Sequence, residues 1–234
     1  MGIQRLTRYA IAACLLLGTG LIAGGCGEQT TAPQVTSASE TTKGGALSSP
    51  LIAGYPSYCF ALNVPWLPQV EPGDWKNTRN CGQAVGVMLG GYFNRGAVAS
   101  WVITEENRWL ASHTGDSRYL TANGWYTGGS RLGAYRQMLK SFHGFNTQVH
   151  YGATPEDVVA EIQRGRPVIC GVMIKGGRLV SSGGVSHWVL ATGWDGRVIL
   201  NDPGTTSGRM IRYSLDDFDK SWKTQGRIYI PVFK

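Results

Sequence analysis

The sequence predicts an α+β domain in which an N-terminal helical part packs on a C-terminal antiparallel β-sheet. Up to about residue 165, apolar residues recur at the three-and-four spacing of helices that bury one face. From Pro167 onward the chain consists mainly of short runs rich in Val, Ile, Tyr and Trp, which is typical of strands. Helices first and strands later, largely segregated, is the pattern of an α+β fold. The 33 glycines and 8 tryptophans also favour a loop-rich domain with β structure over a helical bundle.

The same periodicities place the elements in order. A short extended segment is expected at residues 61–69, where its prolines keep it at a sheet edge. Thr154 is a predicted N-cap with Pro155 in the first turn, Gly165 ends that helix, and Ser214 caps another. Helices are expected at residues 81–93, 104–110, 130–142, 154–164 and 214–222, strands at 167–174, 187–194, 197–201, 209–213 and 227–233, and a long surface loop at 113–129.

Residues 1–26 predict an export signal. Arg5 and Arg8 precede an apolar run of about 15 residues, which is too short to span a membrane comfortably. The run ends in Ala23-Gly24-Gly25-Cys26, which resembles a bacterial lipobox, although such boxes usually carry Leu where this chain has Ala23. We expect Cys26 to be lipid-modified and to anchor the protein to a bacterial membrane. The alternatives are an ordinary cleaved signal, which gives a secreted protein, or an uncleaved anchor.

The next part of the chain predicts a flexible tether followed by one domain. Residues 27–54 are rich in Ser, Thr, Gly and Ala and have few large apolar side chains, so they cannot offset the entropy cost of ordering. Residues 55–234 are long enough to bury a core without disulfides. The net charge of +7 falls to +5 without the two leader arginines (20 basic minus 15 acidic), and the basic residues are scattered. Because the basic residues form no continuous patch, the sequence does not indicate nucleic-acid binding. The net charge supports only a mild attraction to anionic surfaces.

One cysteine stands where a polar, turn-rich approach meets an apolar helical run. Residues 71–80 cannot form a long element, whereas Val85 and Met88 have the spacing of a buried helix face. Asn80 is a good N-cap, so Cys81 is expected at the first helical position. Free backbone N–H groups and the positive end of the helix dipole favour a thiolate there. Cys81 is therefore a candidate nucleophile, and the alternative is a small buried apolar side chain.

Of the four histidines, His187 stands out because it opens an apolar strand directly after a glycine-rich stretch. Such strand ends beside loops often carry catalytic groups. Asp195-Gly196 between two predicted strands is the signature of a two-residue hairpin turn. In such a hairpin Trp194 pairs with Arg197.

This pairing brings an aspartate to the histidine. Val189 would face Asp202, so His187 and Asp202 become diagonal neighbours on one face, roughly 7 to 8 Å apart at Cα. Asn201 would point to the opposite face, and a three-residue turn would exchange the two roles. The alternatives are a strand-end histidine bound to backbone and an aspartate that caps the turn at Pro203-Gly204.

Several short motifs occur in a specific order along the chain. They are Gln69, Cys81-Gly82-Gln83-Ala84, Ser186-His187-Trp188-Val189-Leu190, Gly193-Trp194-Asp195 and Asn201-Asp202-Pro203. This set resembles the papain-like cysteine peptidases and is similar to their family thirty-nine, which contains bacteriocin-leader-processing peptidases and exported stand-alone relatives. The resemblance covers roughly residues 62–233, and it implies a papain-like fold.

The resemblance also implies roles for individual residues. Cys81 would be the nucleophile, His187 the general base and then acid, and Asp202 the orienting carboxylate. Gln69 matches the oxyanion-hole glutamine of the family. Gln83 is a rival for that role, because many relatives carry Pro or Thr at its position. The stretch at residues 96–152 matches no recognised motif and is expected to shape substrate choice.

The implied activity is hydrolysis of peptide bonds through a thioester on Cys81, by a monomer acting on peptide or protein substrates. Two other functions stay open: a catalytically silent, peptidase-like binding module, and a cell-wall amidase or transglutaminase-type acyl transferase with similar side chains. No cofactor is expected. No metal is expected either, because His113, Asp116 and His143 lack tight ligand spacing.

Three cysteines belong to the predicted domain. An oxidising compartment could pair Cys59 with Cys170 and leave Cys81 free, which suits a nucleophile. The alternative is two buried thiols, with Cys170 inside a central strand.

Overall fold

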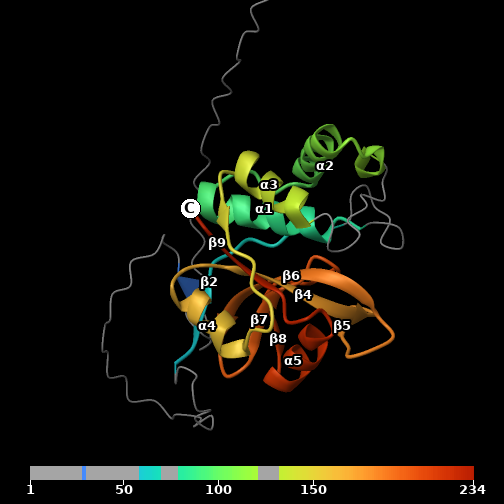
Figure 1. The fold of residues 1–234 in the computed structure, drawn as a ribbon. Coiled ribbons are helices and arrows are strands. Elements are labelled where there is room, and N and C mark those ends of the chain that lie inside the picture. Colours follow the sequence, from blue (N-terminus) through green and yellow to red (C-terminus); the bar gives the residue numbers. More distant parts are fainter. Residues whose placement is uncertain (1–27, 30–57, 70–78, 121–131) are drawn as a thin grey trace, which may run out of the picture.

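The computed structural model of the chain describes residues 28–29, 58–69, 79–120 and 132–234 (Figure 1). The predicted signal at residues 1–26 and most of the predicted tether lie outside the described residues. The helices are α1 (Cys81–Asn94), α2 (Ser100–Thr114), the 3₁₀ turn η1 (Ser117–Leu120), α3 (Leu132–Ser141), α4 (Pro155–Gln163) and α5 (Leu215–Lys223). The strands are β1 (Glu28–Gln29), β2 (Phe60–Leu62), β3 (Asn146–Thr147), β4 (Val168–Lys175), β5 (Arg178–Leu179), β6 (Val185–Trp194), β7 (Val198–Asn201), β8 (Ile211–Tyr213) and β9 (Tyr229–Phe233).

The described strands form one sheet with the order β1-β2-β6-β4-β9-β3, in which β5 pairs with β4, β7 with β6, and β8 with β7. The pairing of β1 with β2 is parallel, and the other pairs are antiparallel. The two longest strands, β4 and β6, pair from Val168 with Ala191 to Ile174 with Val185. Both strands lie inside the sheet, where most residues of β4 and the last six residues of β6 are buried. This position explains why their sequences are nearly continuous apolar runs.

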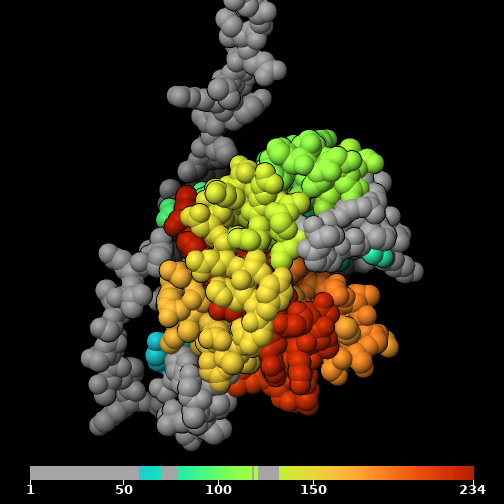
Figure 2. Space-filling view, in the orientation of Figure 1, coloured from blue at the N-terminus to red at the C-terminus, as the bar shows by residue number. Residues whose placement is uncertain are grey.

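The helices form a layer against this sheet. In Figure 1, α1, α2 and α3 lie together above the strands, and α4 and α5 lie in the lower part of the view. Helix α1 is buried all round from Cys81 to Gly90, so it needs cover on both sides. It contacts β6 on one side and α2 on another. Figure 2 shows the helical layer, in green and yellow-green, stacked on the orange and red part of the molecule that includes α5. This arrangement confirms the predicted α+β class.

Local sequence signals fix several helix ends as predicted. Thr154 and Asp157 form a capping box at the start of α4, and Pro155 is its first residue. Gly165, with φ of 76°, follows the end of that helix. Ser214 Oγ accepts a hydrogen bond from the backbone N–H of Asp217 at 3.1 Å and caps α5.

Other elements differ from the prediction. Helix α2 extends well beyond the predicted 104–110 and includes the start of the predicted surface loop. The loop also contains η1, and its residues 121–129 lie outside the described part of the chain, as do residues 130–131 of the next predicted helix. Strand β1 lies within the stretch that composition predicts to be a flexible tether. None of the described helices has the length and apolar character needed to cross a membrane.

Candidate active site

Cys81 is the first residue of α1, as predicted, and 8% of its surface is exposed. Asn80 occupies the N-cap position, but its side chain makes no cap hydrogen bond. Its Oδ1 instead accepts from Asn107 Nδ2 of α2 at 3.1 Å. The predicted N-cap position is therefore confirmed, but the side chain does not cap the helix, because the backbone of Asn80 is not extended (φ −92°, ψ 23°) and the amide has a tertiary partner. The start of α1 is tied to α2 in this way.

The hairpin that carries the predicted histidine has a different turn from the one expected. Trp194 pairs with Val198 rather than with Arg197, so the turn contains one more residue than the Asp195-Gly196 signature predicts. That part of the prediction is wrong. By itself, the extra residue would have exchanged the faces of Asn201 and Asp202.

A β-bulge in β6 restores the predicted register. The pairing shifts between Ala191 and Gly193, which leaves Thr192 as an extra residue on β6. Leu190 consequently faces Asn201, as the two-residue turn required. The extra residue of the turn and the extra residue of the bulge lie on opposite strands, so their effects on the register cancel.

The structure brings His187 and Asp202 into direct contact. His187 Nε2 lies 2.7 Å from Asp202 Oδ1, and both side chains are buried. Asn201 points to the other face, where its Nδ2 donates to Val64 O at 3.0 Å and its Oδ1 accepts from Met210 N at 2.9 Å. The predicted division of faces is confirmed.

Asp202 is fixed by its backbone as well as by its side chain. Its N–H donates to Gly208 O at 2.8 Å, and its carbonyl accepts from Trp66 Nε1 at 2.8 Å. Its Oδ1 also accepts from Gly204 N at 2.7 Å, so the aspartate caps the following turn while it binds the histidine. A Cβ at Gly204 would lie 2.8 Å from His187 Cε1, which is why a glycine is needed where the turn approaches the imidazole.

The two glutamines that competed for one role lie in different surroundings. Gln69 is buried, and its backbone N–H donates to Pro203 O at 2.8 Å, next to Asp202. Gln83 lies two residues after Cys81, but its Nε2 donates to Asn107 Oδ1 at 2.7 Å inside the helical layer. The amide nitrogen of Gln83 is therefore engaged with α2, whereas Gln69 lies beside the turn that carries Asp202.

The thiol and the imidazole form one electrostatic unit. Burial raises the pKa of Cys81, but its hydrogen bond to His187, the charge of His187 and the backbone N–H groups of Trp188 and Gly82 lower that pKa below the ordinary thiol value. Burial lowers the pKa of His187, but its hydrogen bonds to Asp202 and Cys81 and the charges of both raise that pKa to about 10. The two shifts together favour a thiolate–imidazolium pair.

The remaining predicted residues lie elsewhere. Cys59 is exposed and Cys170 is buried in β4, and both are free thiols, so the pairing of these two cysteines is not formed. Burial raises the pKa of the Cys170 thiol. His113 stacks on Trp109 near the end of α2. Within the described part of the chain, no group of His, Cys, Asp or Glu side chains is arranged to hold a metal. Cys26 lies outside the described residues.

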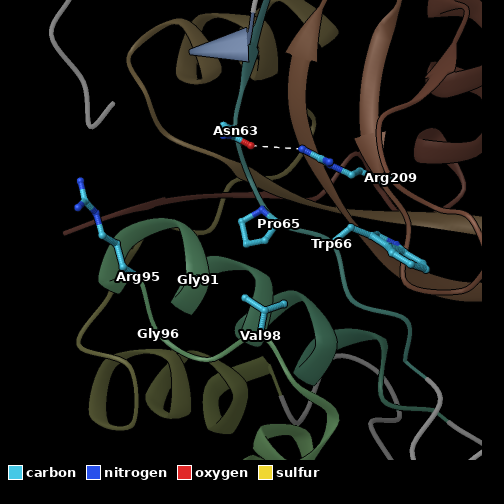
Figure 3. A pocket seen from close by; sticks show the side chains of 8 residues that line it. All are labelled: Asn63, Pro65, Trp66, Gly91, Arg95, Gly96, Val98 and Arg209. Carbon is cyan, nitrogen blue, oxygen red and sulfur yellow. Dashed lines mark hydrogen bonds between the residues drawn. The ribbon is translucent and has the colours of Figure 1, made fainter. Parts of the chain in front are cut away.

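A separate pocket of about 520 Å³ lies between the end of α1 and the segment that follows β2 (Figure 3). Its lining residues are Asn63, Pro65, Trp66, Gly91, Arg95, Gly96, Val98 and Arg209. Figure 3 shows Arg209 reaching toward Asn63, whose Oδ1 accepts its hydrogen bond at 3.3 Å. None of the predicted site residues lines this pocket, although Trp66 joins its wall to the carbonyl of Asp202.

Three buried polar side chains near α1 were not predicted: Glu106, Asn107 and Tyr135. Glu106 and Asn107 share the buried face of α2 with Val102, Ile103 and Leu110. Polar residues at the buried positions of an amphipathic helix can signal a functional or structural role. The helix predicted at residues 104–110 was too short to show that Glu106 and Asn107 lie on the buried face of α2. Tyr135 lies on the buried face of α3 with Leu132, Met138 and Leu139, so the sequence pattern there is that of an ordinary apolar face.

A thiol at a helix N-terminus, facing an imidazole–carboxylate pair on an antiparallel sheet, defines a papain-like arrangement. Residues 61–230 match the Peptidase_C39 like family. Because this match covers most of the chain, the protein belongs to that family, as the sequence motifs implied. Its fold is papain-like α+β, and its class is that of the cysteine peptidases, which are hydrolases.

The chain is similar to several solved structures, two of which are the following. One is a C39-like peptidase from Bacillus anthracis, with 16% identity, a TM-score of 0.48, and coverage of 74% of this chain and 95% of that one. The other is the peptidase domain of Streptococcus ComA, a bifunctional ABC transporter of a quorum-sensing pathway. It has 20% identity, a TM-score of 0.46, and coverage of 73% of this chain and 97% of that one. No match is found among curated proteins.

Proposed function

We propose that this protein is an exported cysteine peptidase that hydrolyses peptide bonds with Cys81, His187 and Asp202. The observation that carries the proposal is the buried His187–Asp202 pair, in which His187 Nε2 lies 2.7 Å from Asp202 Oδ1. His187 also lowers the pKa of the Cys81 thiol at the start of α1. Cys81 and His187 keep 8% and 5% exposure while Asp202 has none, so the sulfur end of the site is the end that a substrate can reach.

The two ring nitrogens of His187 have different partners in the proposed mechanism. Nε2 is bound to Asp202, which leaves Nδ1 for Cys81 and for proton transfer. Asp202 keeps the ring in one orientation and stabilises its positive charge. Because Asp202 is itself held by Trp66 and Gly208, the ring has a rigid support.

The proposed reaction is acyl transfer in two steps. The Cys81 thiolate attacks the carbonyl carbon of the peptide bond, and the negative charge moves to the carbonyl oxygen. The N–H of Cys81 and the side-chain amide of Gln69 donate to this oxyanion. His187 gives its proton to the leaving amine, and a thioester forms. Water then attacks the thioester, His187 takes one of its protons, and the acid product leaves the regenerated ion pair.

Export and anchoring form a second part of the proposal. The lipobox-like end of the leader supports lipid attachment at Cys26, with the protein held at the cell envelope. Radiolabelled palmitate is expected in the wild-type protein and not in Cys26→Ala when both are expressed in a bacterium. Label that is absent from the wild type, or that survives in Cys26→Ala, would remove the anchor from the proposal.

Thiol labelling and substrate cleavage test the activity. Iodoacetamide at pH 6 is expected to modify Cys81 faster than Cys59 or Cys170, because an ordinary thiol has a pKa of about 8.5 and carries little thiolate there. Labelling of Cys81 no faster than Cys59 favours a binding module. A peptide library, casein with an amine acceptor, and peptidoglycan are then supplied in parallel. Peptide cleavage supports the proposal, whereas turnover of only the amine acceptor or the cell wall supports the corresponding rival.

A further inference from the structure

Tyr135 of α3 lies between the two elements that carry Cys81 and His187. Its side chain is fully buried, and its hydroxyl donates to the carbonyl of Gly82 at 2.8 Å. Its ring stacks on that of Trp188, with centroids 6.3 Å apart and planes inclined by 22°. One tyrosine thus contacts both the residue after the cysteine and the residue after the histidine.

The contact with Gly82 is unusually close. A Cβ at Gly82 would lie 3.2 Å from Tyr135 Cε2, so the glycine allows the aromatic ring to rest on the first turn of α1. The carbonyl of Gly82 has two lone pairs, so it can accept from the tyrosine while it takes part in the helix. The hydroxyl and the ring therefore fix the first turn of α1 in two ways.

The two residues that Tyr135 holds also act on the sulfur. The backbone N–H groups of Trp188 and Gly82 lower the pKa of Cys81, as the side chain of His187 does. A shift of α1 relative to β6 would lengthen these contacts together. Tyr135 joins α1 to β6 at this level of the molecule.

We propose that Tyr135 is a positioning residue, which keeps Gly82 and Trp188 in place so that the Cys81–His187 pair has its reactive geometry. It acts through these neighbours, because its burial keeps it away from substrate. The role rests on the proposed function of the same site. It goes beyond that function because it adds a third element, α3, to the machinery that α1 and β6 share.

Tyr135→Phe tests the hydroxyl while it keeps the ring. The matched control is Tyr92→Phe, since Tyr92 lies on α1 and its hydroxyl also donates to a glycine carbonyl, that of Gly165, at 3.3 Å. The first readout is the pH dependence of iodoacetamide labelling at Cys81, which needs no peptide substrate. The second is the separation of kcat from KM on a cleaved peptide.

For Tyr135→Phe we expect the labelling curve of Cys81 to move by about half a unit to one unit toward higher pH. We expect kcat to fall about 3- to 10-fold with KM within twofold, the range that one lost hydrogen bond typically produces. Tyr92→Phe is expected to match the wild type in both readouts. Wild-type behaviour of Tyr135→Phe, or an equal change in Tyr92→Phe, would leave Tyr135 a packing residue only.

Trp188→Ala covers the case in which Tyr135→Phe does not fold. It removes the ring on which Tyr135 stacks but keeps the backbone N–H near the sulfur, and the same upward shift in pH is expected. An unshifted curve in this variant contradicts the proposal. If no peptide is cleaved at all, the labelling curves still decide the role of Tyr135, so the two failures are distinguishable.

Discussion

The described part of the chain holds two buried carboxylate–imidazole pairs with nearly the same distance between their partners. His187 and Asp202 approach to 2.7 Å, and His143 and Glu106 approach to 2.6 Å. All four side chains are less than a tenth exposed. The pair alone therefore does not identify a reactive site.

The surroundings of the two pairs differ. His187 interacts with a thiol as well as with Asp202, since Cys81 and His187 shift the pKa of one another. His143 instead lies between aromatic rings, parallel to Phe145 at 5.2 Å and edge-on to Phe142 at 4.8 Å. The Glu106 carboxylate packs on Gly86, where a Cβ would come within 2.8 Å of Oε1. The second pair joins α2 and the end of α3 to α1, without a nucleophile.

The two pairs also differ in the pKa shifts of their members. His187 has a raised pKa of about 10, since the hydrogen bonds and charges of Asp202 and Cys81 outweigh its burial. Glu106 has its pKa raised to about 7, because burial outweighs the hydrogen bond and charge of His143. A second charged partner, here Cys81, thus favours the charged form of the imidazole in a buried acid–imidazole pair. Without that partner, burial favours the neutral acid.

The largest expected effect follows from removing the thiol. Cys81→Ala is expected to lower kcat/KM by about 10⁴-fold or more, because it removes the thiol that would form the thioester. Peptide cleavage by the purified variant is the measurement, with Cys59→Ala as the control that keeps full activity. Retained activity in Cys81→Ala would show that Cys81 is not the nucleophile. The thiol would then no longer distinguish the His187–Asp202 pair from the His143–Glu106 pair.

Removing each carboxylate separates the two pairs. Asp202→Ala is expected to lower kcat about 10²- to 10⁴-fold, because the His187 ring loses its orientation and its counter-charge. Glu106→Gln is expected to keep kcat within about threefold, because a neutral amide resembles the protonated carboxyl that burial favours. An equal loss of kcat in both variants would show that the second pair also serves catalysis.

Substitution of the two glutamines tests which of them donates to the oxyanion. Gln69→Ala is expected to lower kcat about 10²- to 10³-fold, the usual cost of one oxyanion donor. Gln83→Ala, at a position engaged with Asn107, is expected to reduce the free energy of unfolding by about 1 to 2 kcal/mol with a small change in kcat. Steady-state kinetics and urea unfolding of both variants decide the assignment, and the reverse result would give the oxyanion role to Gln83.

The last expected effect leaves activity nearly unchanged and is a pH dependence of stability at Glu106. The folded state holds its proton up to about pH 7, whereas an unfolded glutamate releases it near pH 4.3. The folded state thus binds more protons between these values, so the stabilisation is full below about pH 4.3 and is lost as the pH rises to about 7.

Urea unfolding at pH 5 and pH 7.5 measures this contribution as the difference between wild type and Glu106→Gln. That difference is expected to fall by about 1 to 3 kcal/mol from the lower to the higher pH. Glu105→Gln, on the partly exposed side of the same helix, is the control and is expected to show no such change. A difference that is flat with pH, or that rises, contradicts the assignment.

Much of the backbone followed from local sequence. Cys81 begins α1, Thr154 and Asp157 cap α4, and Ser214 caps α5, because each signal acts within four residues of itself. The family motifs also marked which cysteine and which histidine to watch. These features depend on short-range chemistry that the sequence displays directly.

The hairpin shows where such reasoning stops. Its turn was predicted one residue too short, and the face of Asp202 was still right only because the bulge at Thr192 cancelled the error. A bulge depends on neighbouring strands: Gly193 lies against β2, where a Cβ would come 2.7 Å from Phe60 O. The sequence of the hairpin alone carries no sign of that contact.

The sequence by itself determined the order of the five described α-helices and the longer strands, the thiol at a helix start, and the family to which the chain belongs. Only the tertiary structure decided that Gln83 binds Asn107, that the Asn80 side chain does not cap α1, and that Tyr135 bridges Gly82 and Trp188. The reason is physical. Periodicity and capping report on groups a few residues apart, whereas a buried polar side chain takes the partner that the packed helices bring to it.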